Sequence, residues 1–176
     1  MLRAKLNLVF KAIQNPRNTR EISHYLKNDF DTLRGVYHYK HPIIFIAGLP
    51  KSGTTWVRTM LAMLPGYNIR PIYDPKGTMV EHYFICDDVF QALPKNRYSI
   101  IKVHTKFSEE NFKIITKYVD RFIVMYRDLR DMCVSRYIHV KNDKTHDLCQ
   151  SYNEWSKDEG MMHSIGLVYK HHVPWV

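Results

Sequence analysis

The sequence contains few cysteines, and they show no pairing pattern. Only Cys86, Cys133 and Cys149 are cysteine, and no two of them have the C-x-x-C spacing of a structural zinc site. An odd number of cysteines without such spacing argues against a disulfide framework and is typical of a reducing compartment. We therefore expect a cytoplasmic protein that needs no metal, because no other spacing, such as H-E-x-x-H, indicates a metal site.

Long apolar runs are also missing. No stretch approaches the roughly 20 apolar residues that a membrane helix needs, and the N-terminus lacks the apolar core and cleavage site of a secretory signal. Residues 1–13 do have apolar side chains at helical spacing, with basic ones outside that stripe. This pattern favours a helix packed on its own domain, and a helix lying on a membrane surface is the alternative.

The chain carries a surplus of positive charge but no basic tail. Its formal net charge of +9 favours anionic partners such as nucleic acid, acidic glycans, a membrane surface or a polyanionic small molecule. Lysine and arginine are spread along the chain, and no helix-turn-helix, zinc-finger or RNA-binding signature accompanies them. Nucleic acid is therefore not the expected partner.

Length and hydrophobic patterning predict one α/β domain. A chain of 176 residues is enough for one domain with a real core, which we place at 42–176 after an amphipathic helical extension at 1–41. Strands alternating with helices predict a P-loop-like three-layer fold, with a central parallel sheet flanked by helices. The expected strands are 43–47, 98–103 and 121–126. The first part of the chain, up to about residue 35, is expected to be helical. Further helices are expected at 55–64, 79–93, 111–118 and 128–140 and in the C-terminal tail. An irregular loop is expected at 68–77.

A glycine-rich loop follows the first expected strand. Gly48 and Gly53 permit tight curvature, and the backbone N–H groups of 52–55 stand at the start of a helix, where they would bind an anion. The ordinary nucleotide-triphosphate loop has lysine directly after its second glycine. Here that position is Thr54, and the cation of the loop is Lys51, two residues before the glycine. The loop predicts a phosphate-type site that differs from the kinase type.

The run Pro50-Lys51-Ser52-Gly53-Thr54-Thr55-Trp56 resembles the donor-binding loop of sulfotransferases that use 3′-phosphoadenosine 5′-phosphosulfate (PAPS). The resemblance implies that Ser52, Gly53, Thr54 and Thr55 hold the 5′-phosphosulfate without a metal. Lys51 would offset the charge that grows on the bridging oxygen. Trp56 would stack on the adenine, and a core aromatic is the alternative for it.

Two further segments resemble motifs of the same family. Arg127, at the end of the third strand, and Ser135, along the next helix, match the pair that holds the donor's 3′-phosphate. Lys102-Val103-His104 at the end of the second strand matches the family's Lys-x-His segment, whose histidine is the catalytic base. Lys102 would help to neutralise the sulfuryl oxygens. Because these segments follow parallel strands, we expect residues 50–55, His104 and Arg127 to converge at one edge of the sheet.

The resemblance covers roughly residues 42–175 and corresponds to the N-terminal portion of the family domain. The family's later Arg-Lys-Gly segment does not occur in the sequence, so its C-terminal part is expected to be absent. The resemblance implies transfer of a sulfuryl group from PAPS to a hydroxyl or amine of a small-molecule or carbohydrate acceptor. The alternatives are a truncated, inactive module that binds anions or a partner and, less favoured, a P-loop kinase. Pairing with another chain, as in a homo-oligomer, would cover surfaces that a short domain leaves exposed.

Overall fold

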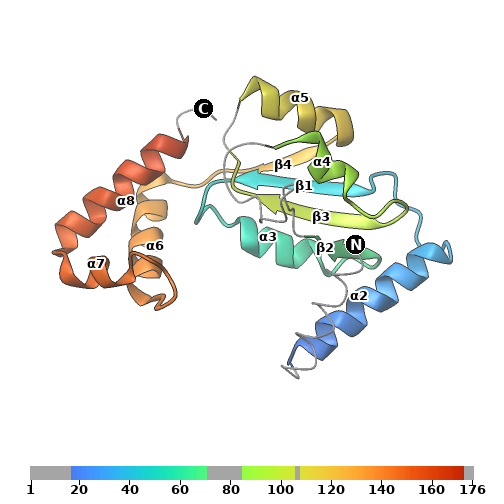
Figure 1. Ribbon diagram of the computed structural model, residues 1–176, viewed down its shortest axis with the longest axis horizontal. Coiled ribbons are helices and arrows are strands. Elements are labelled where there is room, and N and C mark those ends of the chain that lie inside the picture. The colour runs from blue at the N-terminus through green and yellow to red at the C-terminus, as the bar shows by residue number, and fades with distance from the viewer. Residues whose placement is uncertain (1–16, 71–84, 106–107, 173–176) are drawn as a thin grey trace.

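The computed structural model describes residues 17–70, 85–105 and 108–172. Its centre is a parallel sheet in the order β2-β3-β1-β4 (Figure 1). The strands are β1 (Ile43–Gly48), β2 (Tyr67–Ile69), β3 (Tyr98–Val103) and β4 (Phe122–Met125). The helices are α2 (Arg17–Leu33), α3 (Thr54–Leu61), α4 (Asp87–Gln91), α5 (Glu109–Tyr118), α6 (Leu129–Asn142), α7 (Cys149–Glu154) and α8 (Lys157–His172).

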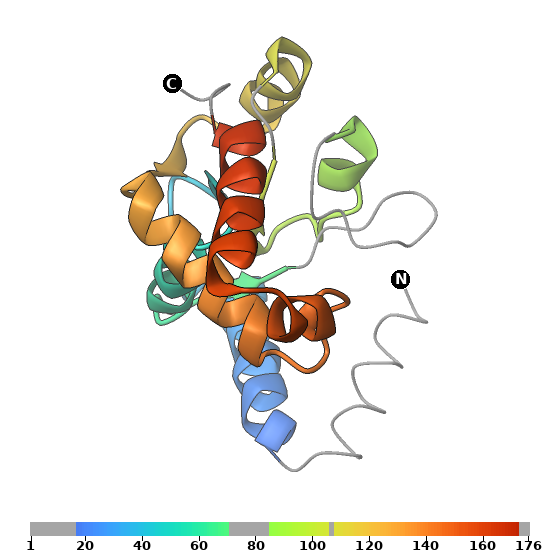
Figure 2. The same cartoon turned by 90° about the vertical axis from the view of Figure 1, so that its left-hand side faces the viewer.

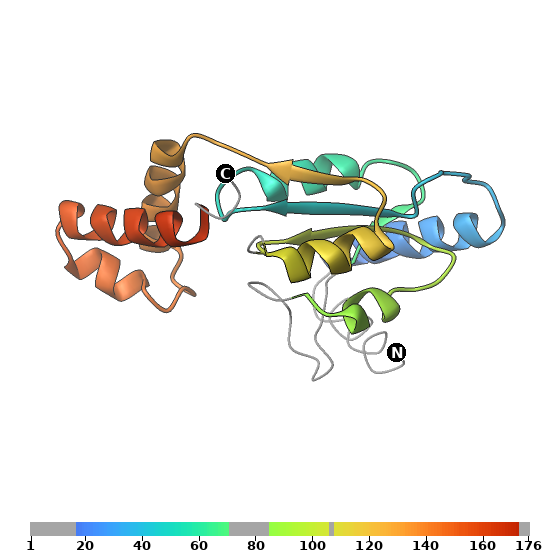
Figure 3. The same ribbon diagram turned by 90° about the horizontal axis from the view of Figure 1, so that it is seen from above.

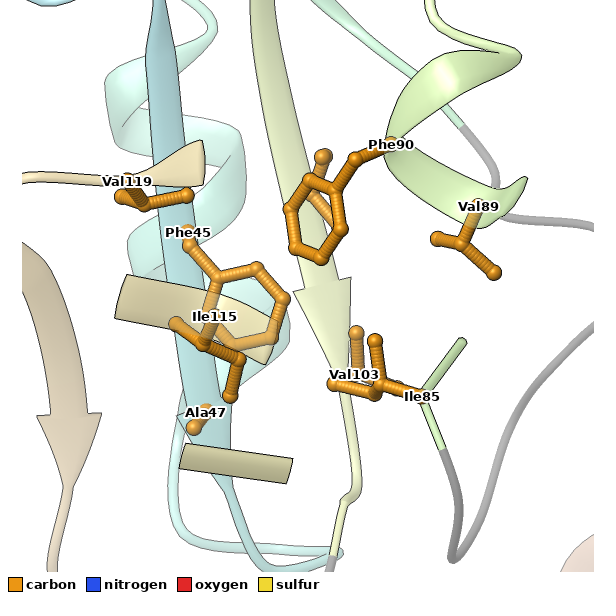
Figure 4. Close-up of a cluster of buried hydrophobic side chains, with 9 residues drawn as sticks. Phe45, Ala47, Ile85, Val89, Phe90, Val103, Ile115 and Val119 are labelled. Atoms are coloured by element: carbon orange, nitrogen blue, oxygen red, sulfur yellow. The ribbon is translucent and has the colours of Figure 1, made fainter. Parts of the chain in front are cut away.

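Helices cover both faces of the sheet. Successive side chains of a strand point to opposite faces, so Phe45 and Ala47 of β1 face α4 and α5, whereas Ile46 faces α3. Figure 4 shows the first of these clusters, in which Phe45 lies among side chains from α4, α5 and β3. Full burial of a side chain such as Ile46 stabilises the fold by about 1.5–3 kcal/mol. Figure 3 shows the three layers from above and confirms the predicted fold class.

A polar network fastens α2 to the edge strand β2. The Asn28 amide donates to Tyr67 O and to Asn68 Oδ1, both at 3.2 Å. Asn68 Nδ2 in turn donates to Asp29 Oδ1 at 2.8 Å, and the same carboxylate lies 2.6 Å from the Arg70 guanidinium. Because Asn28 and Asn68 are buried, the loss of either amide would leave its partners unsatisfied in the interior.

Helices α6, α7 and α8 form a group beyond the carboxyl ends of β1, β3 and β4 (Figures 1 and 2). Tyr137 and Val140 of α6 pack against the fully buried Tyr152 of α7. The Tyr152 hydroxyl lies 2.7 Å from His163 Nδ1 and 3.1 Å from Ser164 Oγ on α8. This packing holds α6 in place next to the end of the sheet where the loop after β1 lies.

The three predicted strands are present within a residue or two of the expected bounds. The prediction of an irregular loop from 68 was wrong at its start, because Tyr67–Ile69 pairs with β3. The expected helix at 79–93 is described only from residue 85, because residues 71–84 lie outside the described residues. In the described part it corresponds to α4. The predicted tail helix is two helices, separated at Trp155 and Ser156. Among the described residues, no helix is long and apolar enough to cross a membrane.

Candidate active site

The loop between β1 and α3 turns sharply at three consecutive positions. Ser52 N and Ser52 Oγ both donate to Leu49 O, at 3.1 and 2.7 Å. Lys51 has a left-handed backbone with φ 72°, and Gly53 has φ 99°. A left-handed conformation costs an ordinary residue such as Lys51 roughly 1–2 kcal/mol. Ser52 therefore stabilises the turn with both of its donors, which are directed inward and not toward a ligand.

The loop closes tightly over Gly48. A Cβ added at Gly48 would lie 2.7 Å from Thr54 Cγ2, 2.9 Å from Met125 Cβ and 3.0 Å from Ser52 Oγ. No ordinary side chain fits between these groups, so only glycine allows the start of α3 to approach β1 and β4 this closely. Beyond the turn, the first N–H groups of α3 at Thr54 and Thr55 have no partner within the helix. They form the anion-binding end of the helix dipole.

His104 follows β3 and contacts the loop directly. Its Nδ1 lies 2.8 Å from Gly48 O and its Nε2 lies 3.1 Å from Lys102 Nζ. A carbonyl oxygen can only accept and an ammonium can only donate, so these partners assign the proton to Nδ1 and leave Nε2 as the acceptor. The geometry therefore selects the neutral tautomer whose Nε2 can take a proton.

A buried side chain anchors the backbone just after His104. Asn111 of α5 donates from Nδ2 to Thr105 Oγ1 at 3.1 Å and accepts at Oδ1 from Ile85 N at 2.9 Å. Both Asn111 and Thr105 are buried. The sequence analysis missed Asn111 as a positioning residue. A polar residue three positions after Ser108, the N-cap of α5, is an ordinary helix-start pattern and gives no sign of this cross-link.

Arg127 connects the end of β4 to the loop. Its Nη1 donates to Lys51 O at 3.3 Å, and its Nη2 lies 3.6 Å from the Asp131 carboxylate. The side chain is partly exposed, so an anion from solvent can reach the guanidinium by displacing Asp131. Ser135 lies half-buried on α6, eight residues after Arg127.

Lys51 stands among the charges of α6. Burial lowers the pKa of Lys51, the nearby charge of Arg136 lowers it further, and Asp143 opposes the change. Burial likewise lowers the pKa of His139, with the Lys51 charge as the next cause. The positive charges of Lys51 and Arg136 both contribute to lowering the pKa of His139, so these groups lie within electrostatic reach of it.

The family comparison agrees with this geometry. A family model described as "Sulfotransferase domain" matches residues 41–175. The chain belongs to the sulfotransferase domain family. No curated protein matches it by sequence.

Among solved structures, this sulfotransferase domain resembles the crystal structure of mouse sulfotransferase SULT7A1 complexed with PAP. The sequence identity is 13%, the TM-score is 0.48, and the match covers 84% of this chain and 53% of that chain. The chain therefore spans about half the length of the matched protein.

The predicted convergence at one edge of the sheet is confirmed for the loop after β1, His104 and Arg127. His104 and Arg127 each contact the backbone of the loop, at Gly48 and Lys51. The contacts that the structure gives do not include one between Ser135 and Arg127. Trp56 is 70% exposed on α3, so it is not part of the core formed by the described residues.

Within the described ranges, no group of three or more His, Cys, Asp or Glu side chains is arranged to hold a metal ion.

Proposed function

We propose that this sulfotransferase domain transfers a sulfuryl group from PAPS to a hydroxyl or amine of an acceptor in one in-line step. The observation that supports it best is the hydrogen bond between His104 Nδ1 and Gly48 O, at 2.8 Å. It puts a proton-accepting nitrogen next to a loop suited to an anion. A base and a phosphate-type cradle at one edge of a parallel sheet are the two parts that the reaction needs.

His104 acts as the general base in this proposal. Its Nε2 takes the proton of the acceptor hydroxyl, the acceptor oxygen forms a bond to sulfur, and the bond from sulfur to the donor's phosphate oxygen breaks. Adenosine 3′,5′-bisphosphate leaves with the electron pair of that bond. Lys102, now 3.1 Å from Nε2, would turn to the sulfuryl oxygens when the acceptor approaches the imidazole.

Positive charge and backbone dipoles hold the donor. The N-terminus of α3, from Gly53 to Thr55, binds the 5′-phosphosulfate, and Ser52 keeps the loop in the conformation that presents these groups. Lys51 offsets the negative charge that develops on the bridging oxygen. Arg127 and Ser135 hold the 3′-phosphate, and binding there replaces the contact between Arg127 and Asp131. The exposed ring of Trp56 offers a face for the adenine.

Two measurements test the proposal. Calorimetry with adenosine 3′,5′-bisphosphate measures whether the site binds the donor's nucleotide. Transfer of label from ³⁵S-labelled PAPS to a panel of acceptors measures whether the protein catalyses sulfuryl transfer. Binding with transfer supports the enzyme. Binding without transfer to any acceptor would favour a non-catalytic anion-binding module, and Mg²⁺-dependent ATP binding in place of the bisphosphate would favour a kinase.

A further inference from the structure

Helix α2, at the margin of the molecule beside β2 (Figure 1), has two different faces. One face carries Asn28 and is bound to β2 by the polar network described above. Residues three and four positions apart lie on one side of a helix, and Leu26, Phe30 and Leu33 have this spacing on another face. These side chains are 66%, 57% and 60% exposed. With the half-buried Ile22, one turn earlier, they form the apolar stripe of α2.

The size of the stripe indicates what kind of partner can cover it. Its four side chains present only a small apolar patch of the kind that single proteins commonly expose. A stable interface between separate chains buries about 800 Å² on each partner, which is more than one short stripe supplies. A segment of the same chain needs less area, because its tether gives it an effective concentration of about millimolar. The stripe therefore fits a tethered segment better than a second copy.

Residues 1–13, which lie outside the described residues, are the tethered segment next to α2. Their sequence has apolar side chains at helical spacing, as set out above. Pro16 directly precedes Arg17, the first residue of α2, and the residue before a proline is disfavoured in a helix. A helix formed by 1–13 would thus end before the proline. The connection of a few residues that remains is the length that joins two antiparallel helices.

The apolar residues on the two sides of Pro16 are placed symmetrically about it. Leu6 and Leu26 are each ten residues from Pro16. One turn away in either direction, Leu2 matches Phe30 and Phe10 matches Ile22, again at equal distances. In an antiparallel pair joined at the proline, residues equally far from the turn lie opposite each other. All three apolar pairs would therefore meet in a single register.

We propose that residues 1–13 form a helix that packs antiparallel on the apolar stripe of α2, with Leu6 against Leu26. Helices packed at the usual axis separation of about 8–10 Å bring such facing side chains into contact. The packing covers the stripe and occupies the same apolar side chains that would otherwise enter a membrane surface. The inference is independent of the proposed function, because neither helix carries a residue of the candidate site.

The test joins facing positions by a disulfide in the full chain. The variant L6C/L26C is compared with the control L6C/L33C, both with C86S and C149S so that these partly exposed thiols do not interfere. Leu33 lies on the same stripe with similar exposure, but it is displaced from Leu26 by about 10 Å along the helix axis. A disulfide requires Cα atoms within about 7 Å. Products are identified by non-reducing electrophoresis and by mass spectrometry of the linked peptides.

We expect L6C/L26C to form the intramolecular disulfide at least about 10-fold faster than L6C/L33C under mild oxidation, because only the first pair satisfies the distance requirement. Equal rates for the two pairs would overturn the inference. Disulfide-linked dimers as the main product would also overturn it, by assigning the stripe to a second copy.

Urea unfolding and vesicle binding give tests without cysteines. L6A and L26A should be coupled, so that the unfolding constant of the double variant departs at least about 2-fold from the value expected for independent sites. L6A and L33A should be additive, and additivity of L6A with L26A would contradict the packing. The unchanged chain is also sedimented with vesicles of phosphatidylcholine and phosphatidylserine. Binding that L6E and L26E each abolish would overturn the inference in favour of a membrane surface.

Discussion

Lys102 Nζ lies 3.1 Å from His104 Nε2, so the nitrogen that we assign to proton transfer already has a cationic donor. The ammonium donates to Nε2 while the Gly48 carbonyl accepts from Nδ1, so the partners of both ring nitrogens match the tautomer that a base requires. In the proposed reaction, an acceptor hydroxyl that donates to Nε2 would displace the ammonium toward the sulfuryl group, where positive charge is useful.

Replacement of His104 by alanine should reduce turnover far more than donor binding. A general base contributes about 10²–10⁴-fold to rate, so we expect kcat with PAPS to fall by about that factor. The affinity for adenosine 3′,5′-bisphosphate should change little, because the imidazole contacts the loop backbone and not the ligand. His38→Ala is the control, since His38 is exposed and precedes β1 at the opposite end of the sheet. Reduced bisphosphate affinity with unchanged kcat would exclude His104 as the base.

Arg127→Ala should weaken bisphosphate binding. Loss of hydrogen bonds to a charged group costs about 1.5–3 kcal/mol, which is about 10- to 100-fold in Kd by calorimetry. The matched control is Arg130→Ala, three residues along, because the Arg130 side chain is 91% exposed and pairs with Asp128 at 2.7 Å. If both variants bind the bisphosphate as the unchanged chain does, Arg127 does not hold the 3′-phosphate.

Gly48→Ala should damage both the fold and the site. The added methyl group meets Thr54, Met125 and Ser52 at 3.0 Å or less, and overpacking of this kind costs about 1–3 kcal/mol. Urea unfolding and bisphosphate calorimetry should both report losses. Gly166→Ala is the opposite case, because nothing lies within 4 Å of its Cβ position in α8. There alanine should stabilise the helix by about 0.5–1 kcal/mol. A G48A variant as stable as the unchanged chain would show that the loop is looser than described.

His139 should contribute to a loss of stability in mild acid. Burial and the charge of Lys51 lower its pKa in the folded state, so below about pH 6.5 the unfolded chain binds more protons at this residue than the folded chain. The free energy of unfolding should therefore fall as the pH drops from about 6.5 through the lower folded-state pKa. His139→Gln should reduce this dependence in urea titrations at several pH values. The effect should be small because the side chain is 49% exposed. A steeper dependence in the variant would mean that the shift has the opposite sign.

The sequence predicts the parts of the fold that are locally determined. β1 is an almost wholly apolar run and β3 is rich in isoleucine and valine, as is typical of buried parallel strands. β2 has only three residues, and its position depends on contacts from α2 through Asn28 and Asn68. A segment this short carries no periodic signal, so the prediction of a loop there was wrong. The break between α7 and α8, in contrast, has a local signal that the prediction overlooked. Ser156 N donates to the Glu159 carboxylate and Glu159 N donates to Ser156 Oγ, which is a capping box at the start of α8.

For the candidate site, the sequence predicts the residues that follow strands and not those that reach the site from helix faces. The loop, His104 and Arg127 lie at strand ends, whose position in a parallel sheet is fixed by topology. Asn111 belongs to the site only because of how α5 is rotated on the sheet. That rotation follows from the burial of Ile115 in the core, which no local pattern specifies.

The hydrogen bond from His104 Nδ1 to Gly48 O joins neighbouring strands. A histidine held only by its own strand would be free to vary independently of the turn beside it. Here any substitution that redirects the Gly48 carbonyl also tilts the ring. In the proposed enzyme, a substitution that changes donor binding through the Gly48 backbone would also change the alignment of the base with the acceptor, so the two properties would evolve together.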